Sequence, residues 1–214
     1  LGVVTIMSGL MILLHKKMGI NDRLLLQDAF NLNSLSGLVR FVKKVVIGTL
    51  VIEGIGALLY MTVFIPDFGS KGIWISIFTS VSAFCNAGID IIAENSLCDY
   101  ALNPMVNTVT CLLIVIGGIG YIVWWDIIRV IKNIRQNKRK IFGNLTLHSK
   151  IAIISTLLLI IVGAILVFVL EYDNPQTLKD YTLLQKIEVS FFQSVTTRTA
   201  GFATLPQENL TDAT

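Results

Sequence analysis

Two short stretches of the chain resemble each other: Ser80-Val-Ser-Ala-Phe-Cys-Asn-Ala-Gly88-Ile and Ser194-Val-Thr-Thr-Arg-Thr-Ala-Gly201-Phe. They lie about 113 residues apart, and each ends an apolar run that is too short to cross a bilayer. Each contains Ala-Gly and then gives way to polar sequence. This pattern predicts two segments that enter a membrane, turn inside it and leave by the same face. Non-helical backbone at membrane depth is tolerated only where it is buried in protein or lines a wet cavity, so the pattern also predicts that the backbone handles an ion.

The composition indicates a membrane protein. Of 214 residues, 54% are hydrophobic and 14% are charged, and the mean hydropathy is +0.73. Soluble domains carry about 25% charged residues. The three cysteines have no recurring spacing, which predicts neither a disulfide framework nor a metal site. Because no serine–histidine–acid set, phosphate-binding glycine loop or paired-carboxylate motif is present, the sequence does not predict an enzyme.

The charges alternate along the chain in sign. Residues 15–44 hold six Lys or Arg and residues 126–150 hold seven, whereas 66–104 hold one Lys and four acidic residues. Under the positive-inside rule the two basic loops are cytoplasmic and the acidic segments lie outside. A nucleic-acid patch is the less favoured interpretation because hydrophobic spans flank the basic runs.

Three runs, 45–65, 105–125 and 151–170, have the length and apolarity of transmembrane helices. Asn103-Pro104 predicts the start of the second, and Trp124-Trp125 predicts an interfacial aromatic belt at its end. The shorter runs 73–84 and 184–197 are expected to be re-entrant. For the run 73–84, topology gives the reason. The spans before and after it both have their basic ends on the cytoplasmic side, so the run must leave the membrane by the face through which it entered.

These elements predict an all-α polytopic membrane protein built from repeated span–pore loop–span units. Residues 1–44 would hold the end of one repeat, with the inner part of a span over 1–14, and a cytoplasmic loop. Residues 45–125 would form a complete second repeat, 126–150 a basic cytoplasmic loop, and 151–214 a third repeat up to its loop. Such internal repetition is typical of channels and transporters.

At this level of detail the chain resembles a known family. Phe78-Thr-Ser-Val-Ser-Ala-Phe-Cys-Asn-Ala-Gly88-Ile and Phe192-Gln-Ser-Val-Thr-Thr-Arg-Thr-Ala-Gly201-Phe are similar to the second and third filter loops of the Trk/Ktr/HKT family of potassium transporters. Leu24-Leu-Leu-Gln-Asp-Ala-Phe, Gly37-Leu-Val-Arg and Gly117-Gly-Ile-Gly-Tyr add to the resemblance. It implies a subunit with four repeats around one pore, of which this chain holds about half and two of the four filter stretches.

Potassium selection needs oxygen ligands that replace a hydration shell, and backbone carbonyls supply them in channel filters. Glycine at positions 88 and 201 permits a positive φ that helps to aim carbonyls inward; a simple tight turn is the alternative reading of an isolated Gly. The residues that would supply the filter are Cys85, Asn86, Ala87, Gly88, Ile89, Thr199, Ala200, Gly201 and Phe202.

Two charged residues are predicted to support the filter. Glu53 lies within a span, where an ionisable group is a functional candidate, and we expect it to face the bundle and bond a loop. Arg198 lies beside the filter, where a cation in the ion path would oppose potassium. We therefore expect Arg198 to point behind the filter and to bond carbonyls or a carboxylate.

The resemblance implies potassium uptake across the cell membrane, with sodium coupling or sodium stimulation left open and no covalent cofactor. It also implies a homodimer and a cytosolic nucleotide-binding regulatory subunit, with the filter loops opening to the outside. Two other functions stay open on the sequence: a secondary transporter of another small solute with broken helices, and a membrane scaffold that transports nothing.

Overall fold

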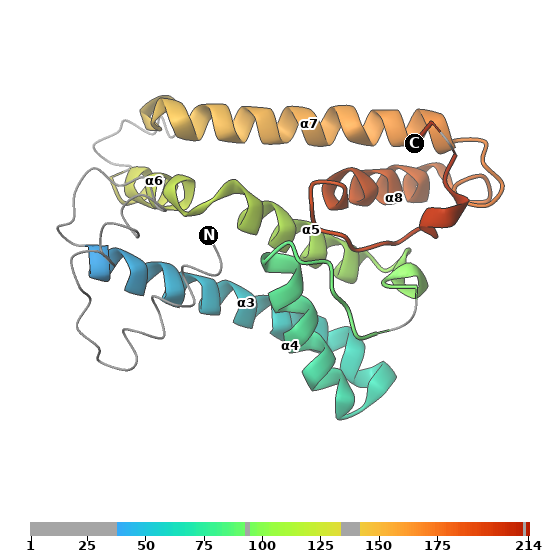
Figure 1. The fold of residues 1–214 in the computed structure, drawn as a ribbon, viewed down its shortest axis with the longest axis horizontal. Coiled ribbons are helices and arrows are strands. Elements are labelled where there is room, and N and C mark those ends of the chain that lie inside the picture. Colours follow the sequence, from blue (N-terminus) through green and yellow to red (C-terminus); the bar gives the residue numbers. More distant parts are fainter. Residues whose placement is uncertain (1–37, 93–94, 134–141, 212) are drawn as a thin grey trace. The chain divides into compact units, whose positions relative to one another are not determined.

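A computed structural model of the chain describes residues 38–92, 95–133, 142–211 and 213–214 (Figure 1). The expected truncated span over 1–14 and the first basic loop up to residue 37 lie outside the described residues, as does the middle of the second basic loop. The chain divides into two compact units, Leu1–Ile55 and Gly56–Thr214. The described part of the first unit is the beginning of helix α3.

The described residues are helical and contain no strand. The α-helices are α3 (Leu38–Phe68), α4 (Lys71–Phe84), α5 (Pro104–Ile119), α6 (Tyr121–Lys132), α7 (Leu147–Glu171) and α8 (Leu183–Thr196). Short 3₁₀ turns are η1 (Cys98–Tyr100), η2 (Phe142–Asn144) and η3 (Gln207–Asn209). The all-α class expected from the sequence is confirmed.

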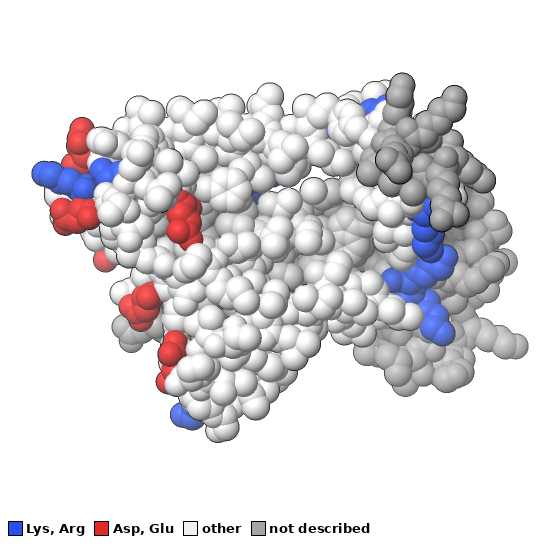
Figure 2. Space-filling view, turned by 180° about the vertical axis from the view of Figure 1, so that it is seen from behind, with Lys and Arg blue, Asp and Glu red and all other residues white. Residues whose placement is uncertain are grey.

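Two of the expected spans are single long helices. Both α3, over Lys43–Phe68, and α7, over Leu147–Glu171, are long and apolar enough to cross a membrane. Leucine and isoleucine side chains along α7 are largely exposed, among them Leu157 at 54% and Ile161 at 56%. Figure 2 shows wide stretches of surface that carry no charged side chain. These surfaces suit lipid or further protein within a membrane rather than water.

The two runs expected to be re-entrant are short helices of equal length. Helices α4 and α8 have 14 residues each, so each rises roughly 20 Å. That is too short for a hydrocarbon core of about 30 Å. Both helices end directly before the quoted Ala-Gly loops, as the sequence predicts.

The third expected span, 105–125, is not one helix. It breaks at Gly120, which has φ 92° and ψ 153°, and α6 leaves α5 at an angle of 97°. Only glycine adopts this backbone region readily. The interfacial belt position expected for Trp124 stays a prediction. Its ring packs edge-on against Phe84, with centroids 5.6 Å apart, and its Nε1 donates to the Ile116 carbonyl at 2.8 Å.

Helix starts follow the local sequence. The Asn103 side chain accepts hydrogen bonds from the backbone N–H groups of Met105 and Val106, with Pro104 at the first helical position, as expected. Helix α8 begins with a capping box in which Thr182 and Gln185 bond reciprocally. These caps fix where helices α5 and α8 begin.

Within the second unit the short helices pack against the long ones through serine–glycine contacts. Helix α8 lies along α7 and also contacts α5, and α4 packs on α5 (Figure 1). A Cβ on Gly163 would collide with the Ser194 hydroxyl, and one on Gly56 would lie 2.5 Å from the Ser80 hydroxyl. Ser80 and Ser194 open the two similar stretches, so the repeat seen in the sequence extends to the packing of each short helix on its preceding span.

Candidate functional site

The two similar stretches form loops with matching hydrogen bonds. The Ser82 hydroxyl on α4 donates to the Ile89 carbonyl at 2.5 Å. The Thr196 hydroxyl on α8 donates to the Phe202 carbonyl, also at 2.5 Å. In both loops the last turn of the short helix therefore bonds a carbonyl of the segment that follows it, with one residue fewer between the partners in the second loop.

The backbone conformations of the two loops also match. Positive φ angles occur at Asn86 (52°) and Gly88 (64°) in the first loop, and at Thr199 (72°) and Gly201 (82°) in the second. The alanine between each pair does not share the positive φ. A backbone in which φ alternates in sign can turn successive carbonyls toward one side, as a cation filter requires.

The two loops meet at their glycines. A Cβ placed on Gly88 would collide with the Ala200 carbonyl oxygen and lie 2.6 Å from the Gly201 Cα. A Cβ placed on Gly201 would lie 3.1 Å from the Gly88 Cα. Two stretches separated by more than a hundred residues thus lie backbone against backbone, and a side chain at Gly88 has no space.

Asn86 braces the first loop through its side chain. With its amide nitrogen turned toward them, it donates to the Ile114 carbonyl on α5 at 3.3 Å and to the Ala83 carbonyl at 3.2 Å. Gly117 on α5 leaves room for the Phe84 carbonyl at the end of α4, since a Cβ there would collide with it. Cys85 and Ala87 are exposed within the loop. These contacts fix the start of the loop against α5.

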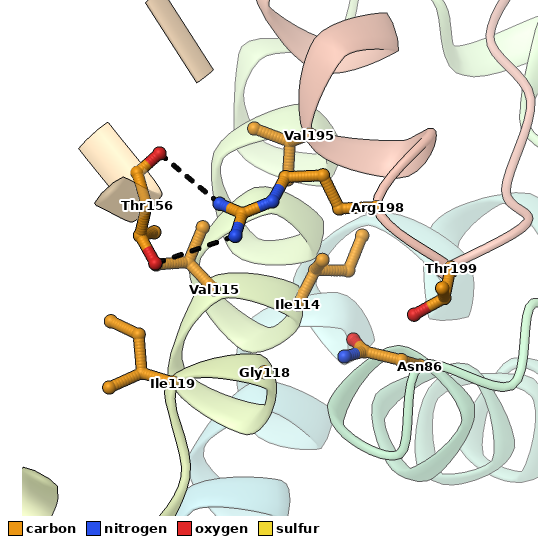
Figure 3. Close-up of a pocket in the computed structure, with 9 residues that line it drawn as sticks. All are labelled: Asn86, Ile114, Val115, Gly118, Ile119, Thr156, Val195, Arg198 and Thr199. Carbon is orange, nitrogen blue, oxygen red and sulfur yellow. Dashed lines mark hydrogen bonds between the residues drawn. The ribbon is translucent and has the colours of Figure 1, made fainter. Parts of the chain in front are cut away.

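A cavity of about 130 Å³ lies beside the two loops (Figure 3). Asn86 and Thr199 line it from the loops, and Arg198 lines it from the turn that follows α8. The remaining lining residues come from α5, α7 and α8: Ile114, Val115, Gly118, Ile119, Thr156 and Val195.

The Arg198 side chain reaches across this cavity to α7. Its Nη1 donates to the Thr156 carbonyl at 3.2 Å and its Nη2 to the Thr156 hydroxyl at 3.4 Å (Figure 3). The partner is therefore a carbonyl, one of the two kinds expected from the sequence. The sequence does not predict a role for Thr156, because a threonine within an apolar run does not indicate which distant residue it contacts.

The second predicted supporting residue, Glu53, lies on α3 in the first compact unit. Its side chain is buried, with 9% of its surface exposed. The two loops predicted to form the filter belong to the second unit, so a supporting role for Glu53 stays a prediction.

The chain matches known proteins over its whole length. Residues 1–214 match the TrkH family, described as cation transport protein. The chain is 36% identical to Ktr system potassium uptake protein B of Bacillus subtilis over 215 residues, which cover 100% of this chain and 46% of that protein. It is 42% identical to potassium/sodium uptake protein NtpJ of Enterococcus hirae over 188 residues, covering 87% of this chain and 39% of that protein.

A further relative is the Ktr system potassium uptake protein B of Vibrio alginolyticus, with 33% identity over 203 residues, covering 94% of this chain and 43% of that protein. The chain thus spans less than half the length of each of these relatives. With matching loops, apolar spans and a family match from the first residue to the last, this chain belongs to the TrkH family of cation transport proteins.

Proposed function

We propose that this chain is part of a potassium-uptake protein of the cell membrane and supplies two stretches of its selectivity filter. The observation that carries the proposal is the pair of equivalent loops, with positive φ at Asn86 and Gly88 and at Thr199 and Gly201, meeting at their glycines. The ion is held by backbone carbonyls of Cys85–Ile89 and of Thr199–Phe202.

The short helices support this assignment electrostatically. Helices α4 and α8 both end at the loops. The C-terminal end of a helix carries a partial negative charge of about half an elementary charge, which stabilises a cation. Two such ends beside one site favour a positively charged ligand.

The names of the relatives support potassium as the transported ion, and one of the names also includes sodium. Two relatives named potassium uptake protein B and one named potassium/sodium uptake protein match nearly all of this chain. We assign potassium as the transported ion and sodium as a coupled or stimulating ion. The filter loops open to the outside and the basic loops face the cytoplasm.

The names of the relatives also bear on the partners of this protein. A Ktr system has more than one component, and a homodimer with a cytosolic nucleotide-binding regulatory subunit is the assembly that the family resemblance implies. The basic segment 126–150 is cytoplasmic in this proposal, so such a subunit would bind on the side of the membrane where this segment lies.

One observation favours the alternative of a secondary transporter with broken helices: the break between α5 and α6 at Gly120. Broken spans in such transporters form the substrate site. Here the break lies outside the paired loops, and the equivalence of those loops explains more of the structure. The filter is therefore the better-supported site.

The test uses the whole parent protein in a bacterial strain that lacks potassium uptake systems. The parent should restore growth at low potassium, and Gly88→Ser or Gly201→Ser should reduce the preference for potassium over sodium in uptake assays. Gly54→Ala is the control, because a Cβ there meets nothing within 4 Å. Unchanged transport and selectivity in both serine variants would overturn the filter assignment.

A further inference from the structure

The outer end of the second loop is bonded to a segment from the preceding repeat. The Leu97 N–H donates to the Ala203 carbonyl at 2.9 Å, and the Cys98 thiol donates weakly to the same oxygen at 3.7 Å. The Ala203 N–H donates to the Ser96 hydroxyl oxygen at 3.3 Å. Both backbone polar groups of Ala203 are thus bonded to three consecutive residues, Ser96–Cys98, which we call the outer clamp.

Ala203 directly follows the filter stretch Thr199–Phe202. The carbonyl of Phe202 is held from behind by the Thr196 hydroxyl of the stretch's own helix. The stretch is therefore fixed at one side by its own repeat and at its outer end by the other repeat. The clamp is a direct polar link between the two repeats beside the filter.

The clamp is itself firmly anchored. Leu97 is fully buried, at 0% exposure, and Ser96 is held at a φ of 56°, which is uncommon outside glycine. The turn after it is closed by the Tyr100 N–H, which donates to the Leu97 carbonyl at 2.9 Å. The Tyr100 hydroxyl in turn donates to Asp67 Oδ2 at 2.7 Å. The clamp is thus tied to the last turn of α3.

From these contacts we infer that the outer clamp is a positioning element for ion selectivity, an inference that rests on the proposed filter function. A filter distinguishes ions through the number and placement of its carbonyl oxygens. Because the clamp fixes where Ala203 lies relative to the preceding repeat, it sets the spacing between the Gly88 and Gly201 stretches at their outer end. Ser96 and Cys98 act through Ala203 and do not bind the ion.

The test compares variants of the full parent protein by uptake of potassium and of sodium. Ser96→Gly keeps the positive φ without strain and removes the oxygen that accepts from Ala203. We expect it to weaken discrimination against sodium by roughly threefold or more, the scale of one lost hydrogen bond, with the maximal uptake rate kept. Ser96→Asn, which tolerates positive φ and keeps an acceptor, should restore part of the discrimination. Ser155→Ala is the control, because that hydroxyl is exposed and bonds only within α7.

Two results would overturn the inference. One is folded Ser96→Gly protein with unchanged discrimination between potassium and sodium. The other applies if Ser96→Gly does not fold: Cys98→Ala, which removes only the weak thiol donor, then decides, and unchanged discrimination in that variant also counts against the clamp. If the unmodified parent takes up no potassium, the proposed function itself fails. If Gly88→Ser changes selectivity and neither clamp variant does, only the clamp fails.

Discussion

Gly88 and Gly201 lie so close that a Cβ on the first would fall 2.6 Å from the Cα of the second. The contact is asymmetric. A Cβ on Gly88 would also collide with the Ala200 carbonyl oxygen, whereas the nearest atom to a Cβ on Gly201 is the Gly88 Cα at 3.1 Å. Both glycines have positive φ. The close contact of the two loops therefore requires that both positions lack a side chain, and the requirement is stricter at Gly88.

Alanine at the two glycines should reveal this asymmetry. Both Gly88→Ala and Gly201→Ala impose positive φ on a residue with a Cβ, which costs roughly 1 kcal/mol or more. Gly88→Ala additionally forces the backbone of the first loop away from Ala200 and Gly201 in the second loop. We expect both variants to lose preference for potassium and Gly88→Ala to lower the melting temperature further, measured on purified protein in detergent. Equal stability of both variants and the unmodified protein would contradict the contact.

The Thr196 hydroxyl should contribute more to the stability of the folded protein than the Ser82 hydroxyl. Thr196→Val leaves the carbonyl of fully buried Phe202 without its donor, and an unmet buried acceptor costs about 1–3 kcal/mol. Ser82→Ala removes the equivalent bond to Ile89, which is 60% exposed, so water can replace it. Thermal unfolding should show a larger loss for Thr196→Val, with Thr196→Ser near the unmodified protein. A larger loss of thermal stability in Ser82→Ala than in Thr196→Val would contradict this expectation.

Local sequence was enough to predict much of this arrangement. The half-length apolar runs predicted α4 and α8, and the similarity of the quoted stretches predicted equivalent roles for Gly88 and Gly201. Hydropathy failed at Gly120, because a count of apolar residues carries no information on φ. A count of apolar residues also could not predict the contact between the rings of Trp124 and Phe84, because Phe84 lies 40 positions earlier in the chain. The bond from Arg198 to Thr156 and the outer clamp join distant segments, so no local pattern could predict them.

Arg198 is expected to act as a brace between α8 and α7. Arg198→Gln loses the charged donor to the Thr156 carbonyl, and hydrogen bonds of charged groups contribute about 1.5–3 kcal/mol. Both the folded yield and potassium uptake should fall. Thr156→Val, which keeps that carbonyl and loses only the weaker contact at 3.4 Å, should have a smaller effect. Normal folded yield of Arg198→Gln with altered selectivity alone would place the guanidinium in the ion path instead.

Tyr100 should make stability sensitive to alkaline pH. Burial, the hydrogen bond to Asp67 and the negative charges of Asp67 and Asp99 raise the pKa of the phenol above its usual value of about 10. The neutral phenol is thus favoured in the folded state. This contribution is fully present below pH of about 10 and is lost as the pH rises through the higher folded pKa. Tyr100→Phe should flatten this alkaline decline in unfolding measurements, and Asp67→Asn should reduce it. An unchanged alkaline profile for both would exclude the pair as its source.

Gly120 is expected to set the bend between α5 and α6. Its φ and ψ lie in a region that other residues occupy at a cost of about 1–3 kcal/mol, and a Cβ there meets nothing within 4 Å. Gly120→Ala therefore tests the backbone alone, without a steric clash. Alanine favours continuing the helix, so we expect the 97° bend to open and the Trp124–Phe84 contact to be lost.

Spin labels at two exposed positions, Leu112 on α5 and Ile128 on α6, would report the opening as a longer distance between labels. The matched control is Gly48→Ala, which also adds a Cβ in open space but lies within helix α3. That variant should leave the label distance unchanged. If Gly120→Ala also left it unchanged at equal stability, the bend would be held by side-chain contacts such as that of Trp124, and the glycine would be incidental to it.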